Sequence, residues 1–254
     1  MKPMSLEFIG RWIAERLRQP SSGYEPFTPS DMATLCATLR PADVLLIEGN
    51  QKLSVGIKYL TQSTWSHAAL YVGPPHELIE VNLGDGCVSS PLQKYETYNT
   101  RICRPVGLSA ADCRAVVGFM VDRIGLQYDM KNIIDLARYL LPTPPVPVRW
   151  RRRMIALGSG APTKAICSSL IAQAFQSVHY PILPLVEDEN GRKPFIPSPY
   201  KRAEILHIRH HSLFTPRDFD LSPFFAIVKP TVERGFNYRD LSWAETEDGA
   251  ERTI

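Results

Sequence analysis

Cysteine is scarce in this chain and shows no paired spacing. The 254 residues include five cysteines, an odd number, and no two of them form a Cys-x-x-Cys pair. Disulfide-stapled small domains and cysteine-rich zinc modules depend on such spacing, so the sequence supports neither class. We expect reduced, mostly buried thiols in a cytoplasmic protein. Apart from Cys167, this expectation concerns Cys36, Cys87, Cys103 and Cys113.

Long apolar runs and strong charge are missing as well. No uninterrupted apolar stretch is long enough to span a bilayer, and the first residues contain no apolar core followed by a small-residue cleavage site. We therefore expect neither a membrane span nor export to the cell wall. The net charge is only +3, and a charge this small does not by itself indicate a nucleic-acid partner.

The remaining composition is that of one globular domain. With 44% hydrophobic and 22% charged residues, the chain can bury a sizeable core. Hydrophobic patterning predicts strands at 44–47, 66–73, 77–81, 100–106 and 224–228. It predicts helices at 52–60, after the Ser109 cap, at 130–141, and after Thr215 and Pro216. Strands and helices without regular alternation indicate an α+β domain with an antiparallel sheet.

Three regions are expected along the chain. They are an N-terminal part (1–40), a catalytic domain (41–232) and a loose acidic tail (233–254). Within the first part, an amphipathic helix at 5–18 precedes a linker rich in proline, serine and glycine, and a short helix begins at Ser30. Such a helix packs on its own domain or on a second subunit, and the alternative is peripheral contact with a membrane.

Cys167 combines a nucleophilic side chain with a helix start. It opens the apolar run that continues through Leu170, Ile171 and Phe175, and the first turn of a helix carries unpaired N–H groups and a partial positive charge. A cysteine placed there loses its proton more readily than a free thiol. The competing interpretation is a buried structural cysteine on the apolar face of the same helix.

A predicted hairpin brings His67 and Glu80 to one face of the sheet. Side chains alternate along a strand, and residues 73–76 supply the turn between the two arms. In one register His67 lies opposite Glu80, and in the other it lies opposite Asn82 with Glu80 on the diagonal. Both registers leave the imidazole and the carboxylate within reach of each other. The competing interpretation is a satisfied histidine beside a solvated glutamate.

Three sequence strings carry a family resemblance: DVLLIEG (43–49), IKYLTQSTWSH (57–67) and ICSSLI (166–171). They resemble the circularly permuted, papain-like NlpC/P60 enzymes of the YiiX/YaeF type. In unpermuted relatives the cysteine helix comes first, whereas the permuted branch has the order histidine, acid, cysteine that is found in this chain. The resemblance implies a permuted papain-like α+β fold, in which an antiparallel sheet packs against helices that include the nucleophile helix.

The resemblance also implies roles for individual residues. Cys167 would be the nucleophile, His67 its base, and Glu80 the group that orients the imidazole. A tyrosine ahead of the cysteine commonly lines the oxyanion region in such enzymes, and Tyr128 in GLQYD (125–129) is similar to it. Ser168, next to the nucleophile, is a second candidate for oxyanion or substrate binding. A long insertion separates Tyr128 from Cys167, which departs from simpler members of the family.

Two further clusters stand out. A basic, proline-rich insertion at 142–162 places arginines around Trp150, and Arg149, Arg151 and Arg152 are candidates for contact with an anionic group. The alternative is a solvated basic loop. His207, His210 and His211 lie within five positions, but no cysteine or carboxylate stands at ligand spacing beside them. We expect no metal and no other cofactor.

These observations predict a thiol hydrolase that acts on a small amide, peptide or acyl substrate through a thioester. The alternatives are a lipid acyltransferase or thioesterase at a membrane surface, and a binding module that keeps the fold without chemistry. The N-terminal helix and the arginines would favour the lipid version. A homo-oligomer is compatible with the same helix.

Overall fold

The computed structural model describes residues 15–16, 19, 31–82, 85–126, 166–183, 185–187, 205–207, 214–230, 237 and 239. Several expectations fall outside these residues. They concern most of the helix at 5–18 and of the linker after it, the helix at 130–141, the insertion at 142–162, Tyr128, Arg149, Arg151, Arg152, His210 and His211.

A six-stranded antiparallel sheet forms the centre of the protein, in the order β4-β3-β2-β1-β5-β8. The strands are β1 (Val44–Ile47), β2 (His67–Gly73), β3 (Glu77–Asn82), β4 (Gly86–Ser90), β5 (Thr100–Pro105) and β8 (Phe225–Val228). The α+β class and the antiparallel pairing are thereby confirmed. Strand β4 was missed because GCVSS is too short and too polar to show a period. A separate antiparallel pair joins β6 (Leu185–Glu187) to β7 (Ile205–His207).

The helices are α2 (Met32–Thr38), α3 (Lys52–Thr61), α4 (Ala110–Val121), α7 (Ile166–Ser177) and α8 (Pro216–Leu221), with a short 3₁₀ helix η1 (Leu92–Tyr95). Of these, α4 and α8 begin where capping residues predict them. Ser109 accepts a hydrogen bond from the Asp112 amide at the start of α4, and Thr215 forms a reciprocal capping box with Asp218 before α8. The cap of α2 is Asp31, one residue later than the expected start at Ser30.

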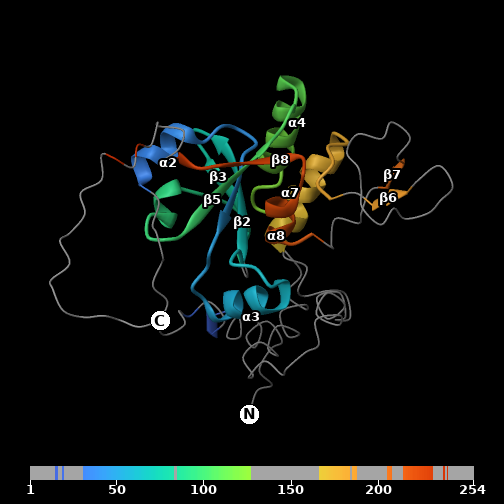
Figure 1. Ribbon diagram of the computed structural model, residues 1–254. Coiled ribbons are helices and arrows are strands. Elements are labelled where there is room, and N and C mark those ends of the chain that lie inside the picture. The colour runs from blue at the N-terminus through green and yellow to red at the C-terminus, as the bar shows by residue number, and fades with distance from the viewer. Residues whose placement is uncertain are drawn as a thin grey trace, which may run out of the picture.

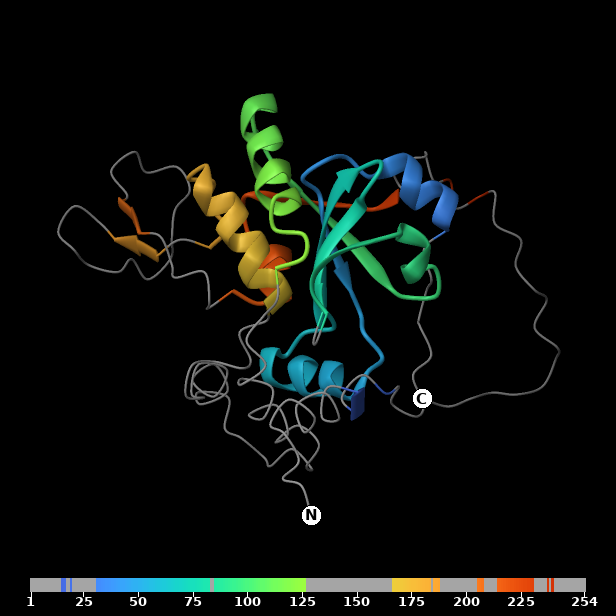
Figure 2. The ribbon, with the colours of Figure 1, turned by 180° about the vertical axis from the view of Figure 1, so that it is seen from behind.

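Helices cover both faces of the sheet (Figures 1 and 2). One buried cluster joins α4, α7 and α8 to the first face, with Phe175 and Phe219 among its largest members. The other joins α2 and η1 to the opposite face through Leu35, Leu45 and Tyr95. Since both faces are covered, the central strand β1 is buried at every residue, which explains its continuous apolar sequence.

One cysteine is not buried as the sequence predicts. All five are free thiols; Cys87 and Cys103 are buried and Cys113 is half-buried, but Cys36 is exposed. Cys36 lies on α2, a single-sided helix whose inner face is occupied by Thr34 and Leu35. The expectation of burial was therefore wrong for Cys36, because Leu35, its apolar neighbour in sequence, is buried on the inner side of the helix while Cys36 lies on the outer side.

Among the residues that the structure describes, no helix combines the length and the apolar character needed to cross a membrane.

Candidate functional site

The hairpin of β2 and β3 sets the relative positions of His67 and Glu80. Leu70 pairs with Ile79 and Tyr71 with Leu78, and a register shift follows between Tyr71 and Gly73. Continuing this pairing toward the start of β2 places Glu80 on the diagonal of His67. The second of the two predicted registers is therefore the one that forms.

The imidazole of His67 contacts the carboxylate of Glu80 directly. His67 Nε2 lies 2.5 Å from Glu80 Oε2. The Glu80 side chain is fully buried, while the His67 side chain keeps 20% of its surface exposed. A carboxylate in this position fixes the orientation of the ring and stabilises its protonated form.

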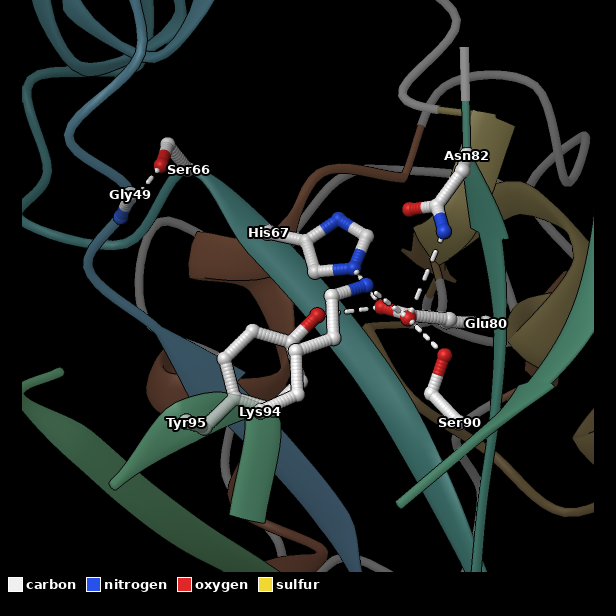
Figure 3. A network of polar contacts seen from close by, with 8 residues as sticks. All are labelled: Gly49, Ser66, His67, Glu80, Asn82, Ser90, Lys94 and Tyr95. Atoms are coloured by element: carbon white, nitrogen blue, oxygen red, sulfur yellow. Dashed lines mark hydrogen bonds and ion pairs between the residues drawn. The ribbon is translucent and has the colours of Figure 1, made fainter. Parts of the chain in front are cut away.

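Glu80 is surrounded by hydrogen-bond donors from several elements (Figure 3). Oε1 accepts from Ser90 Oγ at 2.5 Å and from the ammonium group of Lys94, while Oε2 accepts from the hydroxyl of Tyr95 as well as from His67. Asn82 Nδ2 lies 3.4 Å from Oε1. Because a buried carboxylate is costly without partners, this set of donors is what allows Glu80 to stay ionised inside the protein.

The donors overcome the effect of burial on Glu80. Burial alone would raise the pKa of this carboxyl group, but the hydrogen bond and charge of His67, together with the charge of Lys94, hold the pKa well below its ordinary value. Burial, followed by the charge and hydrogen bond of the same carboxylate, raises the pKa of the Tyr95 hydroxyl well above its usual value. Glu80 is therefore an anion, and Tyr95 a neutral donor, throughout the neutral pH range.

Cys167 approaches His67 from a different part of the chain. Cys167 is the second residue of α7, and this helix contacts β2. Cys167 is buried, with 6% of its surface exposed. The thiol and the imidazole lie close enough for each to shift the pKa of the other. Since Nε2 of His67 contacts Glu80, Nδ1 is the nitrogen left for the sulfur. The predicted thiol, imidazole and carboxylate are thus brought together.

Their interaction favours a thiolate–imidazolium pair. Burial would raise the pKa of the Cys167 thiol, but the charge and hydrogen bond of His67, followed by backbone hydrogen bonds from Ala68 and Ser168, lower it below 9.0. Burial would lower the pKa of His67, but Cys167 and then Glu80 raise it to about 10. Each charged form is stabilised by the other.

Ser168 occupies a different position from the one expected of a substrate-binding group. Its side chain is fully buried, and Oγ donates a hydrogen bond to the backbone carbonyl of Phe214 at 2.9 Å. The hydroxyl therefore ties the start of α7 to the segment that leads into α8. Its backbone, rather than its hydroxyl, lies next to the Cys167 sulfur.

Sequence reasoning missed three partners of Glu80: Ser90, Lys94 and Tyr95. They come from β4 and η1, which were not predicted as elements. A usable signal was the turn after Asn82, because a third antiparallel strand there would return the chain past Glu80. Within the described ranges, no group of three or more histidine, cysteine and acidic side chains is arranged to hold a metal ion.

Comparisons with known proteins add a distant structural likeness. No protein-family model matches the chain, and no curated protein matches its sequence. Among solved structures, the chain is similar to that of the metalloprotein YiiX from Escherichia coli, with 13% sequence identity and a TM-score of 0.44, over 75% of this chain and 96% of that one. At this level of similarity, the function has to be argued from the contacts of the site itself.

Proposed function

We propose that this protein is a cysteine-dependent acyl-transfer hydrolase, an amidase or peptidase that works through a thioester. The observation that carries the proposal is the chain of contacts from Cys167 to His67 to Glu80. Such a chain is the arrangement that nucleophilic catalysis by cysteine requires: a nucleophile, a base within hydrogen-bonding distance, and a group that orients the base.

The proposed reaction starts from the ion pair. The Cys167 thiolate attacks the carbonyl carbon of an amide, and the negative charge that develops on its oxygen is stabilised by the backbone N–H at the start of α7, with Tyr128 as a second donor. When the intermediate collapses, the C–N bond breaks and the His67 imidazolium donates its proton to the departing amine. Cys167 is left as a thioester.

Deacylation uses the same residues in reverse roles. His67, now neutral, accepts a proton from a water molecule as this water attacks the thioester carbonyl. Cleavage of the C–S bond releases the carboxylic acid and regenerates the thiolate beside the imidazolium. Glu80 keeps the ring in place and remains an anion in both steps. If an alcohol or amine replaced the water, the same site would act as a transferase.

The chain order supports a permuted papain-like arrangement for this site. The histidine and the acid lie on adjacent strands that precede the cysteine helix, as the resemblance stated above implies. The non-catalytic alternative is less well supported, because a mere binding groove gives no reason for a lowered thiol pKa beside a buried ion pair. The lipid alternative depends on residues 5–18 and 142–162, which lie outside the described residues.

The proposal is tested by the rate of iodoacetamide alkylation at each cysteine as a function of pH, measured by peptide mass spectrometry. Cys36 is a matched reference because it is exposed to the reagent and the pKa of its thiol is raised, by partial desolvation and then by the charge of Glu77. We expect alkylation of Cys167 to reach half of its maximum at a lower pH than alkylation of Cys36, whatever the absolute rates. In the His67→Ala variant this difference should disappear.

The pH at half-maximal rate, rather than the rate itself, is the informative quantity, because limited access to a buried thiol slows alkylation equally at every pH. If Cys167 and Cys36 titrated together in the wild-type protein, the thiol would not be activated and the hydrolase proposal would be wrong. If Cys167 is activated, cleavage of short peptides and simple amides by wild type and by Cys167→Ala then distinguishes a hydrolase from a reactive but non-catalytic thiol.

A further inference from the structure

The short helix η1 holds one cationic side chain against the site. Leu92 and Tyr95 at its two ends are buried in the second core cluster, and the Leu92 amide donates to Glu77 Oε2 at 2.7 Å. Between them, Lys94 keeps 39% of its side chain exposed but directs its ammonium group to Glu80 Oε1. The anchored helix thus delivers a charge to a carboxylate that lies on another element (Figure 3).

The role of the Lys94–Glu80 contact follows from the charges of the side chains around Glu80. Five side chains face the carboxylate: His67 from β2, Asn82 from β3, Ser90 from β4, and Lys94 and Tyr95 from η1. Ser90, Asn82 and Tyr95 are neutral donors, with the Tyr98 ring stacked edge-on against Tyr95. Among the described residues that contact Glu80, His67 and Lys94 are therefore the two that can carry positive charge.

The two cations contact different oxygens of the Glu80 carboxylate. Lys94 contacts Oε1, while His67 contacts Oε2, so that each oxygen has one cationic partner. Without Lys94, the full charge of a buried carboxylate would act on the imidazolium, and the negative charges of Glu80 and the Cys167 thiolate would outnumber the one positive charge left. With Lys94, the four groups sum to zero when the thiolate–imidazolium pair has formed.

We propose that Lys94 is a positioning residue of the thiol site, which offsets the charge of Glu80 so that His67 can serve Cys167. The proposal rests on the proposed function, in which the thiolate–imidazolium pair is the reactive state. It extends that function by a residue that touches neither the substrate nor the sulfur and acts through Glu80. Lys94 therefore influences the site by electrostatics as well as by holding Glu80 in place.

Removing this charge should shift both titrations of the site in the same direction. In Lys94→Met, His67 faces an uncompensated carboxylate and should keep its proton to a higher pH than in the wild type. Cys167 loses a nearby positive charge, so its thiol should also give up its proton at a higher pH. Alkylation of Cys167 at a pH on the acid side of its titration should consequently fall several-fold, whereas the rate on the alkaline plateau should be retained.

The experiment compares the full-length wild type with Lys94→Met, Lys94→Gln and Lys94→Arg. Lys58→Met is the matched control, because Lys58 also pairs with a carboxylate, that of Glu48 at 3.2 Å rather than that of Glu80, and lies on α3 rather than on η1. Two quantities are measured across pH: the alkylation rate of Cys167, and the NMR chemical shifts of the His67 ring protons. Urea unfolding at neutral pH identifies any variant that has lost its fold.

Upward shifts of both titrations in Lys94→Met and Lys94→Gln, with wild-type behaviour in Lys94→Arg and Lys58→Met, would support the proposal. A lower alkylation rate with unchanged titrations would show that Lys94 is only structural and would overturn it. The His67 titration keeps this test independent of the hydrolase proposal: if Cys167 is not activated in the wild type, an unchanged His67 titration in Lys94→Met still rejects the role of Lys94, and an upward shift still supports it.

Discussion

At the scale of single residues, the site depends on the protonation states of His67 and Cys167. In the folded protein, the pKa of His67 is raised from 6.5 to about 10, and the pKa of Cys167 is lowered from 9.0. The raised pKa of His67 contributes stability that is fully present below pH 6.5 and is lost as the pH rises through about 10. The lowered pKa of Cys167 contributes stability that is present above pH 9.0 and is lost as the pH falls through the folded pKa of the thiol.

Above pH 9.0 the raised pKa of His67 determines the sign of the pH dependence. The unfolded chain has then lost its thiol proton, whereas the folded protein keeps the imidazolium until about pH 10, so stability decreases as the pH rises.

We therefore predict that the stability contributed by the pair decreases at alkaline pH. The free energy of unfolding is measured with urea across pH for the wild type and for the double variant His67→Ala/Cys167→Ala. From pH 9.0 to about 10 the difference between the two proteins should decrease by about 1 kcal/mol. A difference that stayed constant over this range would contradict the raised pKa of His67.

At the scale of elements, the connection between β1 and α3 positions the start of β2. The amide of Gly49 donates to Ser66 Oγ at 2.9 Å, and Ser66 is directly followed by His67. A methyl group on Gly49 would lie 2.8 Å from Ser66 Oγ and would also collide with the Ser54 hydroxyl. A glycine is therefore required by close approach, and the tight fit holds the loop against the strand that carries the histidine.

Gly49→Ala should destabilise the protein by about 1–3 kcal/mol, because the added methyl group forces neighbouring atoms apart. Gly118→Ala is the control: Gly118 lies within α4, and an added Cβ would meet nothing within 4 Å. That substitution should stabilise the protein by about 0.5–1 kcal/mol through the helix preference of alanine. Urea unfolding measures both changes, and equal effects of the two substitutions would refute the role of close packing at Gly49.

At the scale of the whole molecule, the last part of the described chain completes the core beneath the nucleophile helix. Phe219 of α8 packs with Phe175 of α7, with ring centres 6.5 Å apart, and with Phe225 of β8 at 5.5 Å. Strand β8 also pairs with β5 at the edge of the sheet. The helix that carries Cys167 therefore rests on segments that follow it in the chain, and the site forms only when these segments are in place.

Phe219→Ala should cost about 3–5 kcal/mol, since it removes a fully buried aromatic side chain from this cluster. Leu221→Ala is the control on the same helix, because Leu221 keeps 50% of its surface exposed, and it should change stability by less than about 0.5 kcal/mol. Urea unfolding followed by tryptophan fluorescence compares the two. A small effect of Phe219→Ala would mean that α7 is held in place by other contacts.

The sequence by itself determined those features that depend on neighbouring residues. The apolar run of β1, the hairpin through residues 73–76, the Ser109 cap and the Thr215–Pro216 helix start are all found where their local patterns predict them. Each of these patterns arises from side-chain alternation, from capping or from turn chemistry over a few positions, so the sequence contains the whole signal.

Tertiary structure alone decided how the site is completed. It selected one of two hairpin registers, through a bulge between Tyr71 and Gly73. It also placed Lys94 and Tyr95 on Glu80, and Ser168 on the Phe214 carbonyl. These contacts join residues that no local period relates, and they form because a buried carboxylate or hydroxyl is stabilised by whatever partners the packed chain brings to it.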